Sequence, residues 1–357
     1  DILLPHETID DRAVRATINR FNAMRGVRLR GQVTTVDLMK RSSNSGSPYF
    51  TKRRNVTLNT IPVELQRHVE DVIQTLGNDH TNWKSCAVLG WRGQEGGHTK
   101  SDSKQRVVWM FPYGVNVREL QAYQPMIEAA QNNLSIPAWV SMDEVDKTIT
   151  AMFDSIDDRQ LVVCTDFSRF DQHFNRSLQD AAKAIISAIL TPRDDTFEWL
   201  ENVFPVKYMI PLAYKWDHIK YGYHGMASGS GGTNFDETMV HTALQYEAAL
   251  RAKSTLNPYS QCLGDDGILT FPGITVDSVV EAYSSHGQEM NVSKQYASTQ
   301  DCVYLRRWHH KKYRVAGICR GVYSTARALG RLRYLERYYD PDVWGPRMVA
   351  LRQLSII

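Results

Sequence analysis

The segment QCLGDDGILTF, Gln261 to Phe271, places two adjacent aspartates and a glycine between two apolar runs. This pattern predicts a tight turn between paired strands, because aspartate tolerates turn dihedral angles and glycine accepts a positive φ without steric cost. A turn of this kind can serve the fold alone, without any functional role. Adjacent carboxylates nevertheless repel each other unless a cation such as Mg2+ neutralises them. Asp265 and Asp266 therefore also indicate a metal site, which needs a further carboxylate from elsewhere in the chain.

The composition limits the classes of protein to consider. The 357 residues are 42% hydrophobic, enough for a large core divided among two or three subdomains. No run of eighteen apolar residues occurs, which argues against a membrane segment, and the polar start does not resemble a signal peptide. Five cysteines without a C-x-x-C pair favour a reducing compartment over a disulfide framework or a zinc ribbon. The missing initiator methionine and the apolar last residues suggest an excerpt of a longer protein.

Charge is distributed unevenly along the chain. Residues 11–54 hold eleven Lys and Arg against two Asp, and residues 305–337 hold ten against one Glu. Residues 143–289 hold twenty-two Asp and Glu against eleven Lys and Arg. Lys and Arg bind phosphates and carboxylates bind divalent metal, so this pattern suits a polyanion-handling protein with a cation-dependent site. Solvated faces of opposite sign are the alternative explanation.

A second acidic position follows the apolar run in LVVCTDFSRF, Leu161 to Phe170. The run predicts a buried strand that ends at Asp166, with Asp171 just beyond it, and the helical pattern NRSLQDAAKAIISAIL follows. A strand end with two carboxylates is a suitable partner for the Asp265–Asp266 turn. A helix-capping aspartate with a surface aspartate would also explain the segment.

A glycine-rich segment lies between these two acidic sites. Residues 228–232, SGSGG, contain three glycines in five positions, which predicts an irregular loop, and the pattern becomes helical from Thr233 onward. Such a loop at the start of a helix lets the backbone approach a sugar or phosphate closely. A linker followed by a helix cap is the alternative.

The three segments in this order resemble known motifs. DFSRFD, SGSGGTNFDET and LGDDG, separated by roughly 60 and 40 residues, are similar to palm motifs A, B and C of viral RNA-dependent RNA polymerases. The residues within these motifs are most similar to those of the picobirnavirus polymerases, with partitivirus enzymes as relatives. NSGSPYFTKR resembles the template-guiding fingers motif, and KSDSKQRVVWMFP resembles the basic nucleotide-binding motif. MNVSKQY and CVYLRRWHH resemble the last two palm motifs, so the resemblance covers roughly residues 44–310.

This resemblance implies an α+β fold of the right-hand polymerase type, with fingers, a palm built from an antiparallel sheet with helices, and a partial thumb. It assigns residues 1–156 to the fingers, 157–174 to the palm with motif A, 175–221 to a fingers insertion, 222–305 to the palm with motifs B to E, and 306–357 to the start of the thumb.

The resemblance also implies two Mg2+ ions, for which Mn2+ can substitute. Asp166 and Asp265 match their shared ligands, and Asp266 matches a supporting ligand. Lys294 matches the position proposed in the family to protonate the pyrophosphate leaving group. These four residues are the expected catalytic set.

A second set matches the positions that contact the nucleotide in the family. Its members are Lys100, Lys104, Arg106, Asp171, Ser228, Gly229, Thr233 and Asn234. Asp171 matches the acidic residue that senses the ribose 2′-hydroxyl. Many relatives carry an asparagine four residues after the glycine-loop threonine, but here the position is Glu237, so we expect Asn234 to take over that role.

The expected function is template-directed RNA synthesis by two-metal nucleotidyl transfer. The expected partners are the RNA template, the product duplex and ribonucleoside triphosphates, with viral capsid protein as a further candidate and no membrane segment. The expected location is the host cytoplasm or the virion interior.

Three alternatives remain at this point. A reverse transcriptase shares the palm and the paired aspartates, but it usually carries an aromatic gate near the position of Asp171. A non-catalytic RNA-binding scaffold would not need Asp166, Asp265 and Asp266. A carboxylate metal nuclease gives no reason for the glycine loop and the basic segment to occur together.

Overall fold

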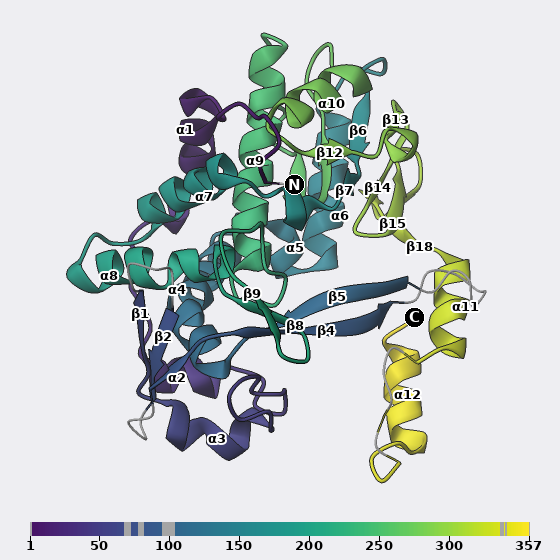
Figure 1. Cartoon of the computed structure of the whole chain (residues 1–357). Coiled ribbons are helices and arrows are strands. Elements are labelled where there is room, and N and C mark those ends of the chain that lie inside the picture. Colours follow the sequence, from purple (N-terminus) through teal and green to yellow (C-terminus); the bar gives the residue numbers. More distant parts are fainter. Residues whose placement is uncertain are drawn as a thin grey trace.

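The computed structural model describes residues 2–67, 73–77, 82–94, 104–335, 339 and 341–356. Helices and short sheets are intermixed along the chain, as expected for an α+β fold. In Figure 1 a long helix, α9, runs through the upper body, and a two-stranded ribbon, β4 and β5, crosses the lower half. The C-terminal helices α11 and α12 stand on one side of that body.

A four-stranded antiparallel sheet lies at the centre. Its order is β10 (Gln261–Leu263), β11 (Asp266–Leu269), β6 (Val162–Thr165) and β13 (Tyr296–Ser298). All four residues of β6 are buried, which confirms the buried strand predicted before Asp166. The hairpin β10–β11 confirms the turn predicted at Asp265.

Helices cover both faces of this central sheet. They are α6 (Met142–Asp154), α7 (Arg176–Ile189), α9 (Thr233–Arg251) and α10 (Val276–Ser285). Because strand side chains alternate between faces, Val163 and Leu269 enter the large core with α7, α9 and α10. Val162, Cys164 and Ile268 instead join a smaller core with α6. The sheet end that carries Asp166 is therefore fixed from two sides.

Helix α9 is buried over most of its length, including several polar residues. A helix with this little exposed surface belongs in the interior rather than at the surface. It begins at Thr233, directly after the glycine loop, as the sequence predicted. Helix α7 begins after the N-cap Asn175, whose side chain accepts a hydrogen bond from the Leu178 N–H, and this confirms the helix predicted there.

A second four-stranded sheet has the order β5, β4, β8, β9. Its bounds are β5 (Lys104–Met110), β4 (Ala87–Gln94), β8 (Leu212–Lys215) and β9 (His218–Lys220). Only the β4–β8 pair is parallel in this sheet. The β4–β8 pair joins two chain segments that lie more than a hundred residues apart in the sequence. Helix α4 (Tyr113–Asn132) follows shortly after β5.

The remaining helices and strands are short. The helices are α1 (Asp11–Arg20), α2 (Gln32–Asp37), α3 (Arg53–Thr60), α5 (Pro137–Val140), α8 (Asp194–Asn202), α11 (Thr325–Arg333) and α12 (Pro346–Leu354), with 3-10 turns η1 (Asn22–Met24), η3 (Phe170–His173), η4 (Phe204–Tyr208) and η5 (Val292–Lys294). The strands are β1 (Glu64–Arg67), β2 (Ile73–Leu76), β3 (Asn82–Lys84), β7 (Phe167–Ser168), β12 (Glu289–Met290), β14 (Asp301–Tyr304), β15 (Arg307–His310), β16 (Arg314–Val315), β17 (Ile318–Cys319) and β18 (Val322–Tyr323).

Two structural findings concern the cysteines and the helices. The five cysteines, all within the described part of the chain, are unpaired, and four of them are buried. None of the described helices combines the length and the apolar character needed to cross a membrane.

Candidate active site

Strand register brings the three predicted aspartates to one end of the central sheet. Thr165 of β6 lies opposite Gly267 of β11, so continuing this register by one residue sets Asp166 opposite Asp266. Cα atoms of directly opposed residues in an antiparallel pair are about 4.5–5.5 Å apart. Asp265 lies beside them in the turn that joins β10 to β11.

Helix α9 holds this turn by both backbone groups of one glycine. The Gly264 N–H donates to Thr238 Oγ1 at 2.9 Å, and His241 Nδ1 lies 2.9 Å from the Gly264 carbonyl oxygen. Gly264 has a φ of +59°, which favours glycine. Burial lowers the pKa of His241 to about 4, so the ring is neutral at pH 7 and its Nδ1–H donates. Sequence analysis did not find Thr238 and His241, although their three-residue spacing puts them on one helix face.

His241 also explains the glycine that follows the aspartates. A Cβ atom at Gly267 would lie 2.5 Å from Cε1 of the His241 ring, so no side chain fits between β11 and α9 at this position. Gly267 is thus required by the packing of strand β11 on α9, whereas the turn itself uses Gly264 with its positive φ.

The backbone of Asp166 is held from the other side by Gln295. The Asp166 N–H donates to Gln295 Oε1 at 3.3 Å, and Gln295 Nε2 donates to the Asp166 carbonyl oxygen at 2.6 Å. Lys294, the preceding residue, ends the turn η5 with an exposed side chain. The segment that positions Asp166 therefore also carries the predicted proton donor.

The carboxylates destabilise one another's charge. Burial, together with the charges of Asp265 and Asp166, raises the pKa of Asp266 to about 7, although the Leu305 N–H and Arg306 act in the opposite direction. Asp265 reaches solvent, yet the surrounding protein removes enough water to raise its pKa, with Asp171 and Asp166 adding to the shift. A site in which several carboxylates resist ionisation together is suited to a cation.

The donor set fits magnesium bound together with phosphate. Across the described residues, no three His, Cys, Asp or Glu side chains form a ready metal cage. Mg2+ usually takes only one or two carboxylates and completes its shell with water and substrate phosphates. One oxygen of Asp266 accepts a hydrogen bond from the Leu305 N–H at 2.8 Å, which leaves Asp265 and Asp166 as the less engaged carboxylates.

The predicted basic residues lie on strand β5 or just before it. Arg106 is exposed and sits opposite Arg92 of β4, and its charge lowers the pKa of Asp265, so it lies within electrostatic range of that carboxylate. Lys104 is the first residue of β5, but its side chain lies outside the described part. Lys100 lies outside the described residues.

Asp171 lies in the 3-10 turn η3, close to α9. Burial raises the pKa of Glu237 well above its usual value, and the charge of Asp171 and a hydrogen bond between the two side chains raise it further. This direction of the pKa shift favours the neutral form of Glu237 beside Asp171. Asn234 is exposed, and its Oδ1 accepts a hydrogen bond from Trp139 Nε1 at 3.0 Å. The geometry thus places Glu237 at Asp171, while the role predicted for Asn234 stays a prediction.

The glycine loop lies against strand β5. Ser228 Oγ donates to the Val107 carbonyl oxygen at 3.4 Å, and a Cβ atom at Gly229 would lie 1.5 Å from the Trp109 carbonyl oxygen. Thr233 Oγ1 donates back to the Ala227 and Ser230 carbonyl oxygens, both at 3.3 Å. The fold therefore brings the glycine loop and the basic strand into contact.

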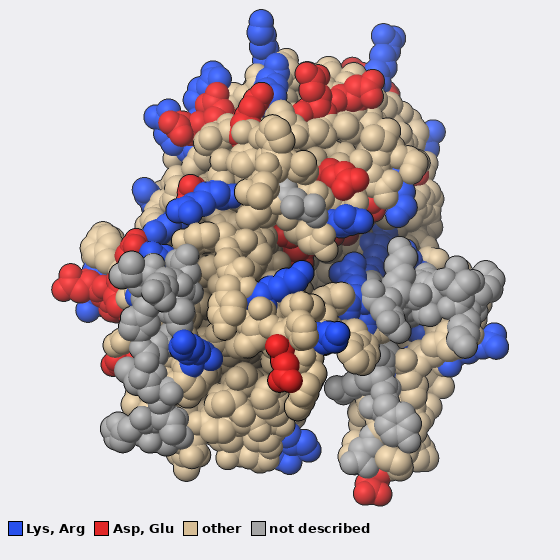
Figure 2. Space-filling model, in the orientation of Figure 1, with Lys and Arg blue, Asp and Glu red and all other residues tan. Residues whose placement is uncertain are grey.

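The basic run after residue 305 is only partly directed outward. Four of its cations form ion pairs with acidic residues 143–158: Arg307 with Asp146, Lys311 with Asp158, Arg314 with Asp154 and Arg320 with Asp143. Arg306 lies in the β14–β15 turn, and its charge lowers the pKa of Asp266. In Figure 2, Lys and Arg side chains border a hollow near the middle of the face, with acidic side chains visible inside it.

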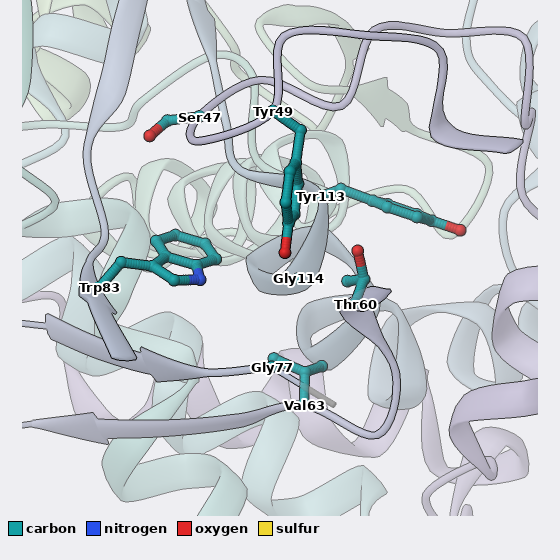
Figure 3. Close-up of a pocket in the computed structure, with 8 residues that line it drawn as sticks. All are labelled: Ser47, Tyr49, Thr60, Val63, Gly77, Trp83, Tyr113 and Gly114. Atoms are coloured by element: carbon teal, nitrogen blue, oxygen red, sulfur yellow. The ribbon is translucent and has the colours of Figure 1, made fainter. Parts of the chain in front are cut away.

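A separate recess lies between the loop at Tyr49, helix α3 and the start of α4. Figure 3 shows the Tyr49 and Trp83 rings on opposite sides of it and the Thr60 hydroxyl pointing inward. Its lining contains no acidic or basic side chain. The recess is therefore not part of the carboxylate site.

Comparisons with known proteins agree with this geometry. The model of the family described as viral RNA-dependent RNA polymerase matches residues 9–349. A potential RNA-dependent RNA polymerase of human picobirnavirus (strain Human/Thailand/Hy005102/-) is 57% identical over 348 residues, covering 98% of this chain and 65% of that protein. The chain therefore spans slightly less than two thirds of the length of this curated relative.

Solved structures show the same fold. An insertion-loop deletion mutant of the RNA-dependent RNA polymerase of a human picobirnavirus superposes with a TM-score of 0.95 at 56% identity, covering 99% of this chain and 69% of that one. The 3Dpol RNA-dependent RNA polymerase of a sicinivirus superposes with a TM-score of 0.67 at 14% identity, covering 98% of this chain and 81% of that one, and shares the fold.

The fold and the carboxylate-bearing sheet end define a nucleic acid polymerase of the right-hand type. Within that class, the chain belongs to the viral RNA-dependent RNA polymerase family and is similar to the picobirnavirus enzymes. Members of this family generally use divalent metal ions.

Proposed function

We propose that the protein to which this chain belongs carries out template-directed RNA synthesis, replicating and transcribing a viral RNA genome. The observation that carries the proposal is the convergence of Asp166, Asp265 and Asp266 at one sheet end, within a chain that belongs to this polymerase family. The expected partners are an RNA template, the product duplex and ribonucleoside triphosphates.

Asp166 and Asp265 would hold two Mg2+ ions, with Asp266 as a supporting ligand and Mn2+ as a substitute. When bound, such ions stabilise the charges on the attacking and leaving oxygens of a phosphoryl displacement. The protein's own contribution is to fix these carboxylates: α9 holds the Asp265 turn through Gly264, and Gln295 holds Asp166. Rigid placement of this kind avoids reorganisation during the reaction.

Arg106, with Lys104 and Lys100, would bind the triphosphate. The fork of an arginine guanidinium matches a pair of phosphate oxygens, whereas lysine acts as a point charge. Lys294 would give a proton to the pyrophosphate leaving group, and its exposed position on η5 leaves the side chain able to reach a bound substrate.

Ribose selection would rest on Asp171 and the glycine loop. The candidates in the loop are Ser228, Gly229, Thr233 and Asn234. Glu237 joins this set because its hydrogen bond to Asp171 fixes the orientation of that carboxylate. Asp171 in place of an aromatic gate favours ribonucleotides over deoxyribonucleotides, which separates this proposal from a reverse transcriptase.

We assign residues 1–156 and 175–221 to the fingers, 157–174 and 222–305 to the palm, and 306–357 to the start of the thumb. We also propose the host cytoplasm or the virion interior as the place of action, with viral capsid protein as a candidate partner. These assignments are supported by the family membership alone.

Substitution of Asp265 by Asn tests the catalytic assignment. The variant and the wild type, each as the full-length protein, are incubated with heteropolymeric RNA, labelled ribonucleotides and Mg2+. The variant should fold normally and make no template-complementary product, because a neutral amide cannot bind two cations beside phosphate. Robust synthesis by the variant would refute the assignment. A wild-type preference for deoxyribonucleotides would refute the proposed function.

A further inference from the structure

Glu119 of helix α4 holds the glycine loop by its backbone and by a side chain. The Ser230 hydroxyl donates to Glu119 Oε2, and the Gly231 N–H donates to Glu119 Oε1 at 3.2 Å. Glu119 is fully buried, so both bonds form away from competing water. A buried side chain that accepts from two successive loop residues fixes the loop at two points.

Glu119 is itself held within a chain of polar contacts. Asn116 Nδ2 donates to Glu119 Oε1 at 3.1 Å and to the Gly229 carbonyl oxygen at 3.4 Å. On its other side, Asn116 Oδ1 accepts from Arg53 at 2.9 Å. Arg53 is the first residue of α3 and the last of the segment that resembles the template-guiding motif. The chain of contacts therefore joins that segment to the glycine loop.

The loop has no space to move toward α4 or β5. A Cβ atom would lie 1.5 Å from the Trp109 carbonyl oxygen at Gly229, 3.0 Å from the Leu120 side chain at Gly231, and 2.3 Å from the Tyr123 ring at Gly232. Packing on one side thus prevents inward movement. The bonds to Glu119 prevent the loop from lifting away.

We propose that Glu119 is a positioning residue for nucleotide selection, which fixes the Ser228–Gly232 loop against strand β5 and couples it through Asn116 and Arg53 to the template-guiding segment. This inference rests on the proposed function. Glu119 touches neither substrate nor metal in this role, and it acts only through the loop. Its loss therefore changes how well the loop presents Ser228 to the nucleotide.

The test compares Glu119→Leu with Glu128→Leu in full-length protein. Both variants remove a glutamate from α4, but Glu128 pairs with Arg30 and its side chain is 55% exposed. Single-nucleotide incorporation is measured with matched ribo- and deoxyribonucleotides. Glu119→Leu is expected to raise the KM for ribonucleotides and to lower the ribo-to-deoxy preference roughly tenfold, equivalent to about 1.4 kcal/mol. Glu128→Leu is expected to leave both unchanged.

Ser230→Ala removes the hydroxyl bond to Glu119 and the bond that this hydroxyl accepts from the Gly232 N–H at 3.1 Å, and it leaves the sequence of α4 unchanged. It is expected to shift the ribo-to-deoxy preference in the same direction. If Glu119 acts through this loop, the loss of preference in the double variant should be smaller than the product of the two single losses. The proposal would be overturned if the loss of preference in the double variant equalled the product of the two single losses, or if Ser230→Ala left the preference unchanged. Should Glu119→Leu not fold, the result for Ser230→Ala decides.

A readout without catalysis separates this inference from the proposed function. Amide hydrogen exchange in peptides spanning the loop should be at least several-fold faster in Glu119→Leu and unchanged in Glu128→Leu. Equal exchange in the wild type and Glu119→Leu would overturn the anchor. An inactive wild-type protein would count against polymerase function and would leave this exchange result as the measure of the anchor.

Discussion

Replacing Asp266 by Asn should make the metal-free protein more stable. Burial and the neighbouring charges of Asp265 and Asp166 raise the pKa of Asp266 to about 7, against 3.8 for the ordinary aspartate. Folding therefore penalises the ionised form of this side chain. Asparagine has nearly the same shape, stays neutral at every pH and can still accept the hydrogen bond from the Leu305 N–H.

The size of the effect follows from the pKa difference. A difference of about three units corresponds to about 4 kcal/mol, and partial exposure of the carboxyl reduces this to roughly 2–4 kcal/mol. Between pH 4 and 7 the folded wild type binds more protons than the unfolded chain, so its stability falls as the pH rises. The advantage of the variant should thus be small at pH 4 and reach its full value above pH 7.

The assay is thermal unfolding in the presence of a chelator at several pH values. For a chain of this length, the expected stabilisation corresponds to a rise in Tm of about 3–5 °C at pH 8. Adding Mg2+ should stabilise the wild type by mass action and stabilise the variant less, because one ligand has lost its charge. The wild type should therefore regain part of the difference when the ion is present.

Asp301→Asn provides a matched control of opposite sign. Burial raises the pKa of Asp301, but hydrogen bonds from Ser298, Trp308 and Tyr296 outweigh it and lower the pKa overall. Its substitution should destabilise the protein. The reasoning fails if Asp266→Asn is less stable than the wild type at pH 8 without metal, or if its advantage is the same at pH 4 and pH 8.

Three further predictions concern other parts of the site. Asp171→Ala should lower ribonucleotide incorporation more than deoxyribonucleotide incorporation, by about tenfold or more in the ratio, and an unchanged ratio would contradict the sugar-sensing role. Arg307→Gln should lower the free energy of unfolding by about 2–4 kcal/mol in denaturant, because buried Asp146 loses its closer arginine and keeps only His309 and the more distant Arg320; a neutral result would show that the pair contributes little. His241→Leu should slow synthesis at least tenfold in kinetic assays, because the bond to the Gly264 carbonyl is lost. In the wild type, protonation of this histidine in the unfolded chain lowers the stability as the pH falls from 6.5 to 4, and unfolding measurements should show that the variant lacks this decrease.

Local pattern was enough to predict the elements that carry the aspartates. The apolar run before Asp166 and the turn residues at Asp265 have short-range causes, namely burial of a strand and the dihedral angles of a hairpin. These segments formed as predicted, as β6 and the β10–β11 hairpin. Family resemblance then supplied the partner for each segment, which periodicity alone could not do.

The contacts that fix those elements were not predictable in the same way. Gln295 reaches Asp166 from 129 residues away, and Glu119 reaches Ser230 from 111 residues away. A buried polar side chain has no periodic signal of its own, because its position depends on which distant backbone group needs a partner. The uneven charge distribution suggested that the basic residues after 305 bind a polyanion. Several of them, including Arg307, instead neutralise acidic residues of the same chain, which the sequence pattern could not reveal.

The two hydrogen bonds from α9 to Gly264 restrict where insertions and deletions can occur in this chain. Each residue added to a helix rotates everything after it by about 100°. One extra residue between Gly232 and Thr238 would rotate Thr238 and His241 away from the turn or displace the glycine loop. Both hydrogen bonds to Gly264 would then be lost together. Residues 252–260, between α9 and β10, face no such constraint from helical phase. Related sequences should therefore differ in length after α9 and keep a constant spacing from the glycine loop to His241.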